Sequence, residues 1–172
     1  MPSLSHLKRV LALTAIAATL SACAPMTQLP PGTPYTSVVD QYGKPNFTCR
    51  LPDGQERVIW TQQPMGQYAW GSDLSADGRV EKVEALLTDA HFKRLGEGVW
   101  SAERVRCEFG PPAEIREAGL PSVRQVVWAY RYRESGVWNS LMYVYMGRDG
   151  KQVTRFHPGP DPMYEERNQG WW

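Results

Sequence analysis

Apolar and polar residues follow the same order twice along this chain, which predicts two copies of one structural unit. Each copy begins with a short helical segment, over residues 34–42 and again over residues 101–109. Each segment stops at a glycine that is followed two residues later by a proline, at Gly43 and at Gly110. Glycine adopts the conformation that caps a helix, and proline cannot continue one. Thr33 precedes a proline and is the expected N-cap of the first helix.

Strand-like alternation follows each helix stop. Residues 126–133 alternate bulky apolar side chains with smaller or basic ones, a period of two that places an aromatic stripe on one face of a sheet. The first copy has a shorter counterpart at residues 57–61, centred on Trp60. Residues 134–139 are expected to form a hairpin loop. The other expected strands, paired across an Asp-Gly turn in each copy, cover residues 67–74, 79–86, 140–146 and 152–156.

These elements predict an α+β protein of two tandem units, each with short helices packed on a three-stranded antiparallel sheet. A short helix over residues 88–95, capped by Thr88, opens the second unit, and the first unit has no equivalent of it. The run over residues 79–86 also fits helical spacing, so its assignment as a strand has an alternative.

The N-terminus has the plan of a bacterial signal peptide, because Lys8 and Arg9 precede an apolar run over residues 10–20. As a helix this run spans about 16 Å, half of the roughly 30 Å hydrocarbon core, which is too short for a permanent transmembrane segment. The run ends in Leu-Ser-Ala-Cys, a sequence that resembles a lipobox, in which Cys23 is lipidated and becomes the first residue of the mature chain. The alternative is an ordinary small-residue cleavage site with a cysteine nearby.

Lipidation of Cys23 implies a membrane-anchored protein. One acyl chain binds a membrane only marginally, whereas the three chains of a bacterial lipoprotein hold it in effect permanently. Bacteria that sort lipoproteins usually retain in the inner membrane those with Asp after the lipidated cysteine, and here Ala24 follows it. The resemblance therefore implies an outer-membrane protein whose soluble part faces the periplasm.

The expected organisation has five parts. They are a cleaved lipoprotein signal peptide (residues 1–22), a lipidated tether (23–31), a first unit (32–87), a second unit (88–158) and a proline-rich C-terminal tail (159–172). Removal of the first 22 of the 172 residues leaves 150.

The two remaining cysteines form an even pair once Cys23 carries lipid. Cys49 and Cys107 either bridge each other in the oxidising periplasm or stay as two separate buried thiols. Neither lies in a Cys-x-x-Cys motif or beside a histidine, so redox or nucleophilic catalysis is not indicated.

Composition excludes several classes of function. With 19 basic and 18 acidic residues, the chain has no field that would attract nucleic acid, and its three histidines are too few for a metal-rich protein. The sequence contains no nucleophile elbow, no His-Glu-x-x-His and no phosphate-binding glycine loop. We therefore expect no enzyme activity, no cofactor and no metal.

Aromatic residues are the candidate binding residues, since the chain has seven tryptophans and eight tyrosines against four phenylalanines. Those in the alternating strands, such as Trp60 and Trp128, are expected to fill the cores. Four others lie in or beside the second strands, where both faces carry apolar residues: Trp70, Trp138, Tyr143 and Tyr145. They predict either an interface between the two units or a docking surface, because Tyr and Trp concentrate in binding hot spots. The terminal pair Trp171 and Trp172 is expected to pack back or to stay disordered.

The order of these motifs resembles the SmpA/OmlA domain family, and more closely the proteobacterial lipoproteins that carry two such BamE-like units. The resemblance covers roughly residues 29–162. Its clearest segments are residues 55–60, 64–66, 77–80, 87–92, 110–112 and 159–162. It implies two tandem layers of helices on antiparallel sheets. The architecture is also similar to that of the β-lactamase inhibitor protein, a fold that presents a surface to another protein.

The sequence thus predicts a noncatalytic lipoprotein of the outer membrane that acts as a protein-interaction scaffold in the envelope. Envelope biogenesis or outer-membrane β-barrel assembly is the process that the family resemblance implies. The alternatives are a ligand-binding module for lipid or peptidoglycan, whose mark would be a groove lined by Trp138, Tyr143 or Tyr145, and an enzyme-inhibitor-like binding protein.

Replacement of the lipidated cysteine tests the anchor. In Cys23→Ser the protein should leave the detergent phase of a phase-separation assay or be misprocessed, because the acyl chains can no longer be attached. Unchanged partitioning of this variant would contradict lipidation at Cys23.

Overall fold

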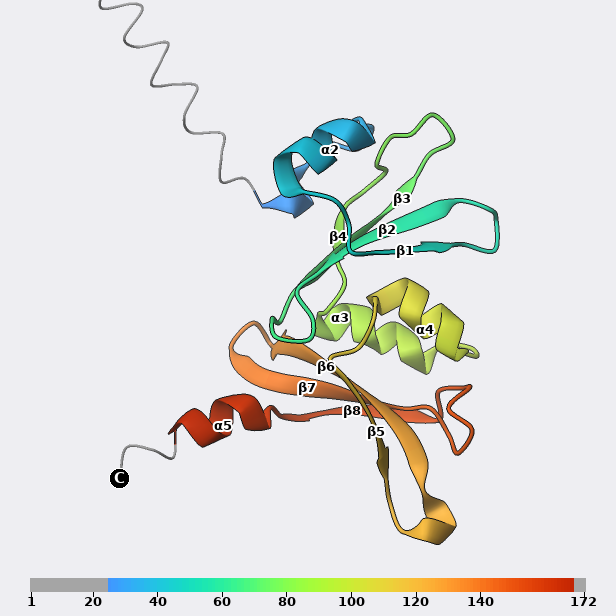
Figure 1. The fold of residues 1–172 in the computed structure, drawn as a ribbon, viewed down its shortest axis with the longest axis vertical. Coiled ribbons are helices and arrows are strands. Elements are labelled where there is room, and N and C mark those ends of the chain that lie inside the picture. Colours follow the sequence, from blue (N-terminus) through green and yellow to red (C-terminus); the bar gives the residue numbers. More distant parts are fainter. Residues whose placement is uncertain (1–24, 169–172) are drawn as a thin grey trace, which may run out of the picture.

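Two four-stranded antiparallel sheets alternate with short helices along the chain (Figure 1). The structure is a computed structural model and describes residues 25–168. Each sheet is a meander whose strands pair in chain order. The first sheet contains β1 (Phe47–Arg50), β2 (Glu56–Thr61), β3 (Ala69–Leu74) and β4 (Glu84–Ala85), and the second contains β5 (Glu114–Ala118), β6 (Gln125–Glu134), β7 (Trp138–Tyr145) and β8 (Arg155–Pro160).

The helices are short and lie before, between and after the sheets. The α-helices are α2 (Tyr35–Tyr42), α3 (Asp89–Phe92), α4 (Ala102–Phe109) and α5 (Pro162–Asn168), and the 3-10 helices are η2 (Met26–Gln28), η3 (Lys93–Gly96) and η4 (Pro121–Val123). Helix α2 covers one face of the first sheet, and α3 and α4 lie between the two sheets (Figure 1). The layers therefore run helix, sheet, helix, sheet.

The two halves repeat the same local structure. Helices α2 and α4 end at Gly43 and Gly110, which have φ angles of 80° and 81° that favour glycine. The first residue of each helix donates its backbone N–H to the hairpin turn of its own sheet, from Tyr35 to Gly78 O and from Ala102 to Lys151 O. The repeat expected from the sequence is thus present in the backbone as a helix followed by a four-stranded meander.

Helix α2 packs on the first sheet through a small core. Val38 of α2 contacts the sheet face that carries Val58 and Trp60, and Met26 of η2 is buried in the same cluster. The indole N–H of Trp60 donates to Gly43 O at 2.8 Å, which ties the end of α2 to the sheet. Part of the segment expected to be a tether therefore belongs to the folded body from Met26 onward.

The larger core lies between the sheets and belongs to both halves. Ile59, Ala69 and Leu86 of the first half pack in one cluster with the helix residues and with the second sheet. The rings of Phe92 and Phe109 stack at its centre with centroids 4.9 Å apart. The two units therefore share this larger core, and the first unit has in addition its own small core under α2.

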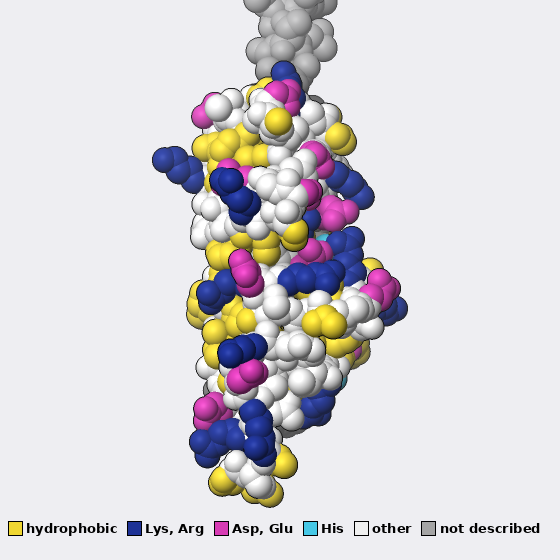
Figure 2. Space-filling model, turned by 90° about the vertical axis from the view of Figure 1, so that its right-hand side faces the viewer, with side chains coloured by type: hydrophobic (Ala, Val, Ile, Leu, Met, Phe, Trp, Pro, Cys, Tyr) yellow, Lys and Arg dark blue, Asp and Glu magenta, His cyan; other side chains and the backbone are white. Residues whose placement is uncertain are grey.

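The β5–β6 hairpin forms the end of the molecule opposite η2 and α2 (Figure 1). Its tip carries η4, where Leu120 is 72% exposed and Val123 is 56% exposed. Figure 2 shows hydrophobic side chains gathered at this end with basic side chains beside them.

Each sheet has four strands, so the expectation of three was wrong. The missed strands are β1 and β5, which contain only four and five residues. They lie at sheet edges, where one side of the strand has no partner and burial is slight, and the apolar alternation that reveals a strand is therefore weak.

The expected third strand of the first unit shrinks to the two residues of β4. The physical reason is that its apolar residues serve two cores. Val80 and Val83 pack under α2, whereas Leu86 and Leu87 enter the core between the sheets. The apolar residues change cores along the segment, from positions 80 and 83 to positions 86 and 87, instead of alternating residue by residue, so the period of a strand is not kept.

Other element boundaries in the structure also differ from those expected from the sequence. The N-cap of α2 is Pro34, because the Thr33 hydroxyl donates to Pro30 O at 2.6 Å instead of capping the helix. The loop expected over residues 134–139 is a turn of three residues, since β6 runs to Glu134 and β7 starts at Trp138. The cap at Thr88 is confirmed, as its hydroxyl accepts from His91 N–H at 3.2 Å.

The segment expected to be an extended tail begins with regular structure. Strand β8 starts three residues later than the expected strand and continues to Pro160, and α5 follows directly. Two prolines and one glycine, Pro158, Gly159 and Pro160, are tolerated in β8 because it is an edge strand, where backbone donors on the outer side need no partner.

Cys49 and Cys107 join β1 to α4 across the two halves, and loss of this link should weaken the whole fold. For cysteines 58 residues apart, the chain-entropy model gives about 4 kcal/mol of stabilisation, so Cys49→Ala/Cys107→Ala should lower the free energy of unfolding by about that much. Urea denaturation of the oxidised protein, the reduced protein and the variant measures this difference. Equal stability of the variant and the oxidised protein would contradict the prediction.

Candidate functional site

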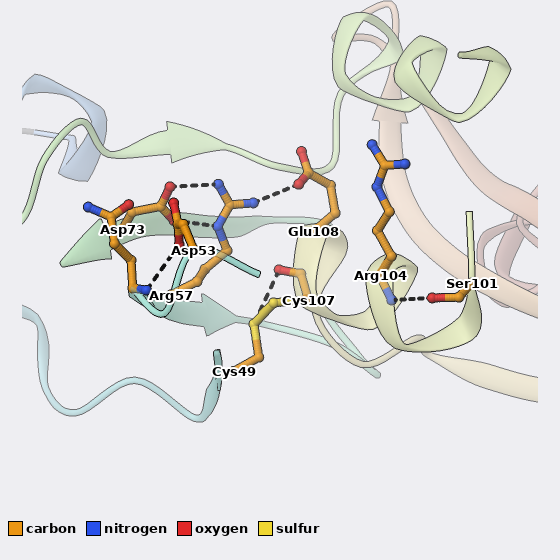
Figure 3. The surroundings of a disulfide bond; sticks show 9 residues. Cys49, Asp53, Arg57, Asp73, Ser101, Arg104, Cys107 and Glu108 are labelled. Carbon is orange, nitrogen blue, oxygen red and sulfur yellow. Dashed lines mark hydrogen bonds and ion pairs between the residues drawn. A yellow bond between two sulfur atoms is a disulfide. The ribbon is translucent and has the colours of Figure 1, made fainter. Parts of the chain in front are cut away.

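The junction between the two halves contains a disulfide and partly buried charges (Figure 3). Cys49 on β1 bonds Cys107 on α4, with their Cα atoms 5.7 Å apart. Of the two alternatives that the sequence left open, the structure has the bridge.

Arg57 on β2 lies next to this disulfide and pairs with both halves (Figure 3). Its Nε and Nη2 donate to the two oxygens of Asp73 on β3, at 2.6 and 3.2 Å. Its Nη1 donates to Glu108 Oε2 on α4 at 2.7 Å. This guanidinium therefore joins the first sheet to the central helix layer, and its fork geometry fixes their relative orientation.

Glu108 also contacts a guanidinium and an imidazole of the second half. Arg94 Nη1 donates to Glu108 Oε1 at 2.8 Å, and His91 Nε2 lies 2.7 Å from the same oxygen. Burial disfavours the charged carboxylate, but the contacts with His91 and the two guanidinium groups outweigh it and lower the pKa of Glu108 to about 2. The carboxylate is thus ionised at neutral pH and stabilises the junction.

The β2–β3 loop forms a second link, because Gln63 extends the second sheet. Its side-chain Nε2 donates to Arg131 O at 2.8 Å, and its Oε1 accepts from Arg131 N–H at 3.2 Å. Arg131 lies on β6 beyond the end of its pairing with β5, so the carboxamide takes the place of a strand partner. Arg131 Nε also donates to Pro64 O at 2.7 Å. The loop of one half is therefore fastened to the sheet of the other.

The face of the second sheet turned away from α3 and α4 carries no helix (Figure 1). We call this the outer face and define it by five side chains: Arg116, Tyr143, Tyr145, Arg155 and His157. Val127, Ala129 and Leu141 are buried on the same side of the strands. The outer face is therefore an apolar sheet surface overlaid with aromatic and basic groups.

The side chains of the outer face hold one another in place. Arg116 lies over the Tyr143 ring at 5.1 Å, and Arg155 lies over the Tyr145 ring at 3.6 Å. The His157 ring stands 5.6 Å from Tyr143 and 5.5 Å from Tyr145, measured between centroids. These cation–π and ring contacts order the surface before any partner binds.

The aromatic residues selected from the sequence separate into three places. Tyr143 and Tyr145 lie on the outer face. Trp70 packs against the core under α2, with Tyr68 stacked on it at 5.9 Å. Trp138 is 68% exposed at the start of β7.

The sequence did not reveal Arg116, Arg155 and His157 as neighbours of these tyrosines. Their only signal was cross-strand register, in which Tyr143 faces His157 and Tyr145 faces Arg155, and that register requires the true position of β8.

A cavity of about 490 Å³ lies where the β6–β7 turn, the end of β8 and α5 meet. Trp138 lines it, as the alternative function expected, but neither Tyr143 nor Tyr145 does. The cavity and the outer face are thus separate places on the second half.

The described residues show no metal centre and no membrane-spanning helix. Among residues 25–168, no group of three or more His, Cys, Asp or Glu side chains is placed to hold a metal ion. No helix in the same range is long and apolar enough to cross a bilayer. Cys23, Trp171 and Trp172 lie outside the described residues.

Neutralising Glu108 tests the electrostatic part of the junction. The ordinary pKa of 4.5 is lowered on folding, so the carboxylate stabilises the fold above pH 4.5 and loses this effect as the pH falls toward 2. Glu108→Gln should lower the free energy of unfolding at pH 7 by about 2 kcal/mol, less than the full shift gives because the cluster reaches solvent.

Denaturation at a series of pH values measures this difference. The gap between the variant and the unmodified protein should close between pH 4.5 and 2. Glu103→Gln, an exposed substitution on the same helix, is the matched control and should change stability little. A gap that stays constant with pH would show that shape, and not charge, is what Glu108 contributes.

Comparison with known proteins gives no relative from which a function could be transferred. No protein-family model matches the chain, and no curated protein and no solved structure is significantly similar to it.

Proposed function

We propose that this protein is a noncatalytic, lipid-anchored lipoprotein of the outer membrane that presents a binding surface to another envelope protein. One observation carries the proposal: three of the four sheet faces are covered by helices, and the fourth, the outer face, is covered by none among the described residues (Figure 1). Ordered aromatic and guanidinium groups of the kind that fill this face are typical of binding hot spots.

The position of the anchor supports this reading. Met26 is buried in the core under α2, and Cys23 precedes it by three residues, a span of at most about 11 Å. Acyl chains on Cys23 would hold the α2 end close to the membrane. The outer face and the β5–β6 hairpin, at the other end, would then point into the periplasm (Figure 1).

The resemblance to two-unit SmpA/OmlA lipoproteins supplies the process in this proposal. Envelope biogenesis, and within it β-barrel assembly at the outer membrane, is the setting in which such a scaffold would act. The shared core supports a rigid arrangement of the two units, as a scaffold requires, and it agrees with the α+β layers that the resemblance implies.

Binding of a lipid or of peptidoglycan is the second candidate function. The cavity beside Trp138 favours it, because an exposed indole next to polar groups is suited to a ligand. This candidate uses a different part of the second half and does not need the outer face.

Site-specific photocrosslinking in intact cells tests the scaffold function. Crosslinking residues placed at Tyr143 and at Arg116 should both capture the same envelope protein, because the two side chains are neighbours on the outer face. The same residue at Lys44, exposed beyond the end of α2, is the control and should capture at least about fivefold less of it. Equal yields at all three positions would contradict the proposal.

A second measurement separates binding from folding. Tyr145→Ala should lower the yield from a crosslinker at position 116 about tenfold, as expected when a hot-spot ring is removed. Because Tyr145 is half-exposed, the unfolding midpoint of the protein should change little. Loss of yield together with loss of folded protein would point to a structural role instead.

A further inference from the structure

The cavity at the end of the second sheet has walls of two kinds. Its lining comes from the β6–β7 hairpin, the end of β8 and α5, and includes Glu134, Trp138, Pro158, Pro160, Asp161 and Glu165. The indole and the prolines are apolar, and the remaining groups include three carboxylates. At about 490 Å³ the cavity has room for a small organic group.

The charge of the lining is one-sided. Glu134, Asp161 and Glu165 are acidic, and none of the described residues that line the cavity is Lys, Arg or His. The guanidinium of Arg131, which does not line the cavity, pairs with Asp161. A concave surface with carboxylates and a partly apolar wall concentrates a negative potential.

Asp161 adds an independent observation. It is fully buried and is one of the residues that line the cavity, and its Oδ2 has no hydrogen-bond partner. The other oxygen, Oδ1, accepts from Arg131 and from the backbone N–H of Met163. Arg131 is itself shared with Glu114 and with Pro64 O, so it offsets the charge of Asp161 incompletely. A buried carboxylate oxygen without a donor is costly, and a cation in the cavity would relieve that cost.

Trp138 decides which kind of cation fits. Trp138 is 68% exposed and lines the cavity together with Pro158 and Pro160. The face of an indole attracts ammonium and guanidinium groups, and the prolines suit the alkyl chain that carries them. A metal ion is not indicated, since no three ligating side chains within residues 25–168 converge.

We propose that this cavity binds an alkylammonium or guanidinium group. The group is either a Lys or Arg side chain presented by a partner protein or a free aliphatic amine, since both offer the same chemistry to carboxylates and an indole. This inference concerns the same cavity as the second candidate function but names a ligand of different chemistry, and it does not depend on the outer face.

Nuclear magnetic resonance of the mature full chain in detergent micelles tests the proposal. The probes are N-acetyl-lysine methylamide, N-acetyl-arginine methylamide and 1,5-diaminopentane, with N-acetyl-norleucine methylamide as the neutral control of similar shape. The cationic probes should shift the Trp138 indole N–H saturably, with at least about tenfold stronger binding than the neutral one.

Matched variants locate the site. Glu165→Gln and Trp138→Ala should each weaken binding of the lysine probe about fivefold, because each removes one attractive wall. Binding to Trp138→Ala, which lacks the indole, is followed at the backbone amide of Asn139, another residue of the lining. Glu97→Gln replaces an exposed acid away from the cavity and should leave binding unchanged. Asp161→Asn is not used, since Asp161 also pairs with Arg131 in the fold.

The outcomes distinguish a protein side chain from a free amine, and both of these from a neutral glycan. Tighter binding of the lysine probe than of the diamine indicates a protein side chain, and the reverse order indicates a free amine. Equal binding of the norleucine and lysine probes, or no saturable shift with any cation, would overturn the proposal. If neutral glycan fragments shift Trp138 while the amines do not, the second candidate function stands and only the cationic ligand is wrong.

Discussion

Helix α4 packs against both sheets, and the positions of the other layers follow from this double burial. Cys107 on the helix bonds the first sheet, Glu108 beside it accepts from Arg57 of that sheet, and Phe109 enters the core above the second sheet. Three consecutive residues thus make a covalent, an ionic and an apolar contact to different neighbours. A helix held in this way cannot rotate or slide without breaking all three contacts, so the orientation of the two sheets is fixed by one turn of helix.

This arrangement also accounts for the stability of units that are small by themselves. A unit of about 60 residues buries too little apolar surface to be more than marginally stable alone. Here the second face of the first sheet, with Ile59 and Leu86, finds its cover in the helices of the other half. The buried pairs around Arg57 contribute less to net stability than to orientation, because desolvation offsets much of their attraction. The apolar core and the disulfide hold the halves together, and the charged pairs fix their relative orientation.

The sequence predicted the parts of this structure whose signal is local. Glycine stops at Gly43 and Gly110 end their helices, and the central strands around Trp60 and Trp128 lie where alternation placed them. The edge strands were missed because pairing on one side only leaves little apolar alternation in the sequence. The shared core was missed because apolar periodicity shows that a face is buried but does not show which neighbour covers it. The same limit applies to the outer face. Tyr143 and Tyr145 were identified by residue type, whereas His157 joins them only through the register of β7 with β8.

Burial of Met26 changes what an anchored body of this shape can do. A long flexible tether would let the domain sample many orientations, and binding would then cost the entropy of choosing one. With the core beginning at Met26, the freedom between a lipid on Cys23 and the folded body is limited to a few bonds. The junction removes the remaining freedom, since α4 locks one sheet to the other. With the anchor proposed above, a partner at the outer face would meet a surface that is already ordered and already turned away from the membrane. The proposal therefore favours presentation of a fixed surface over a conformational switch as the basis of function.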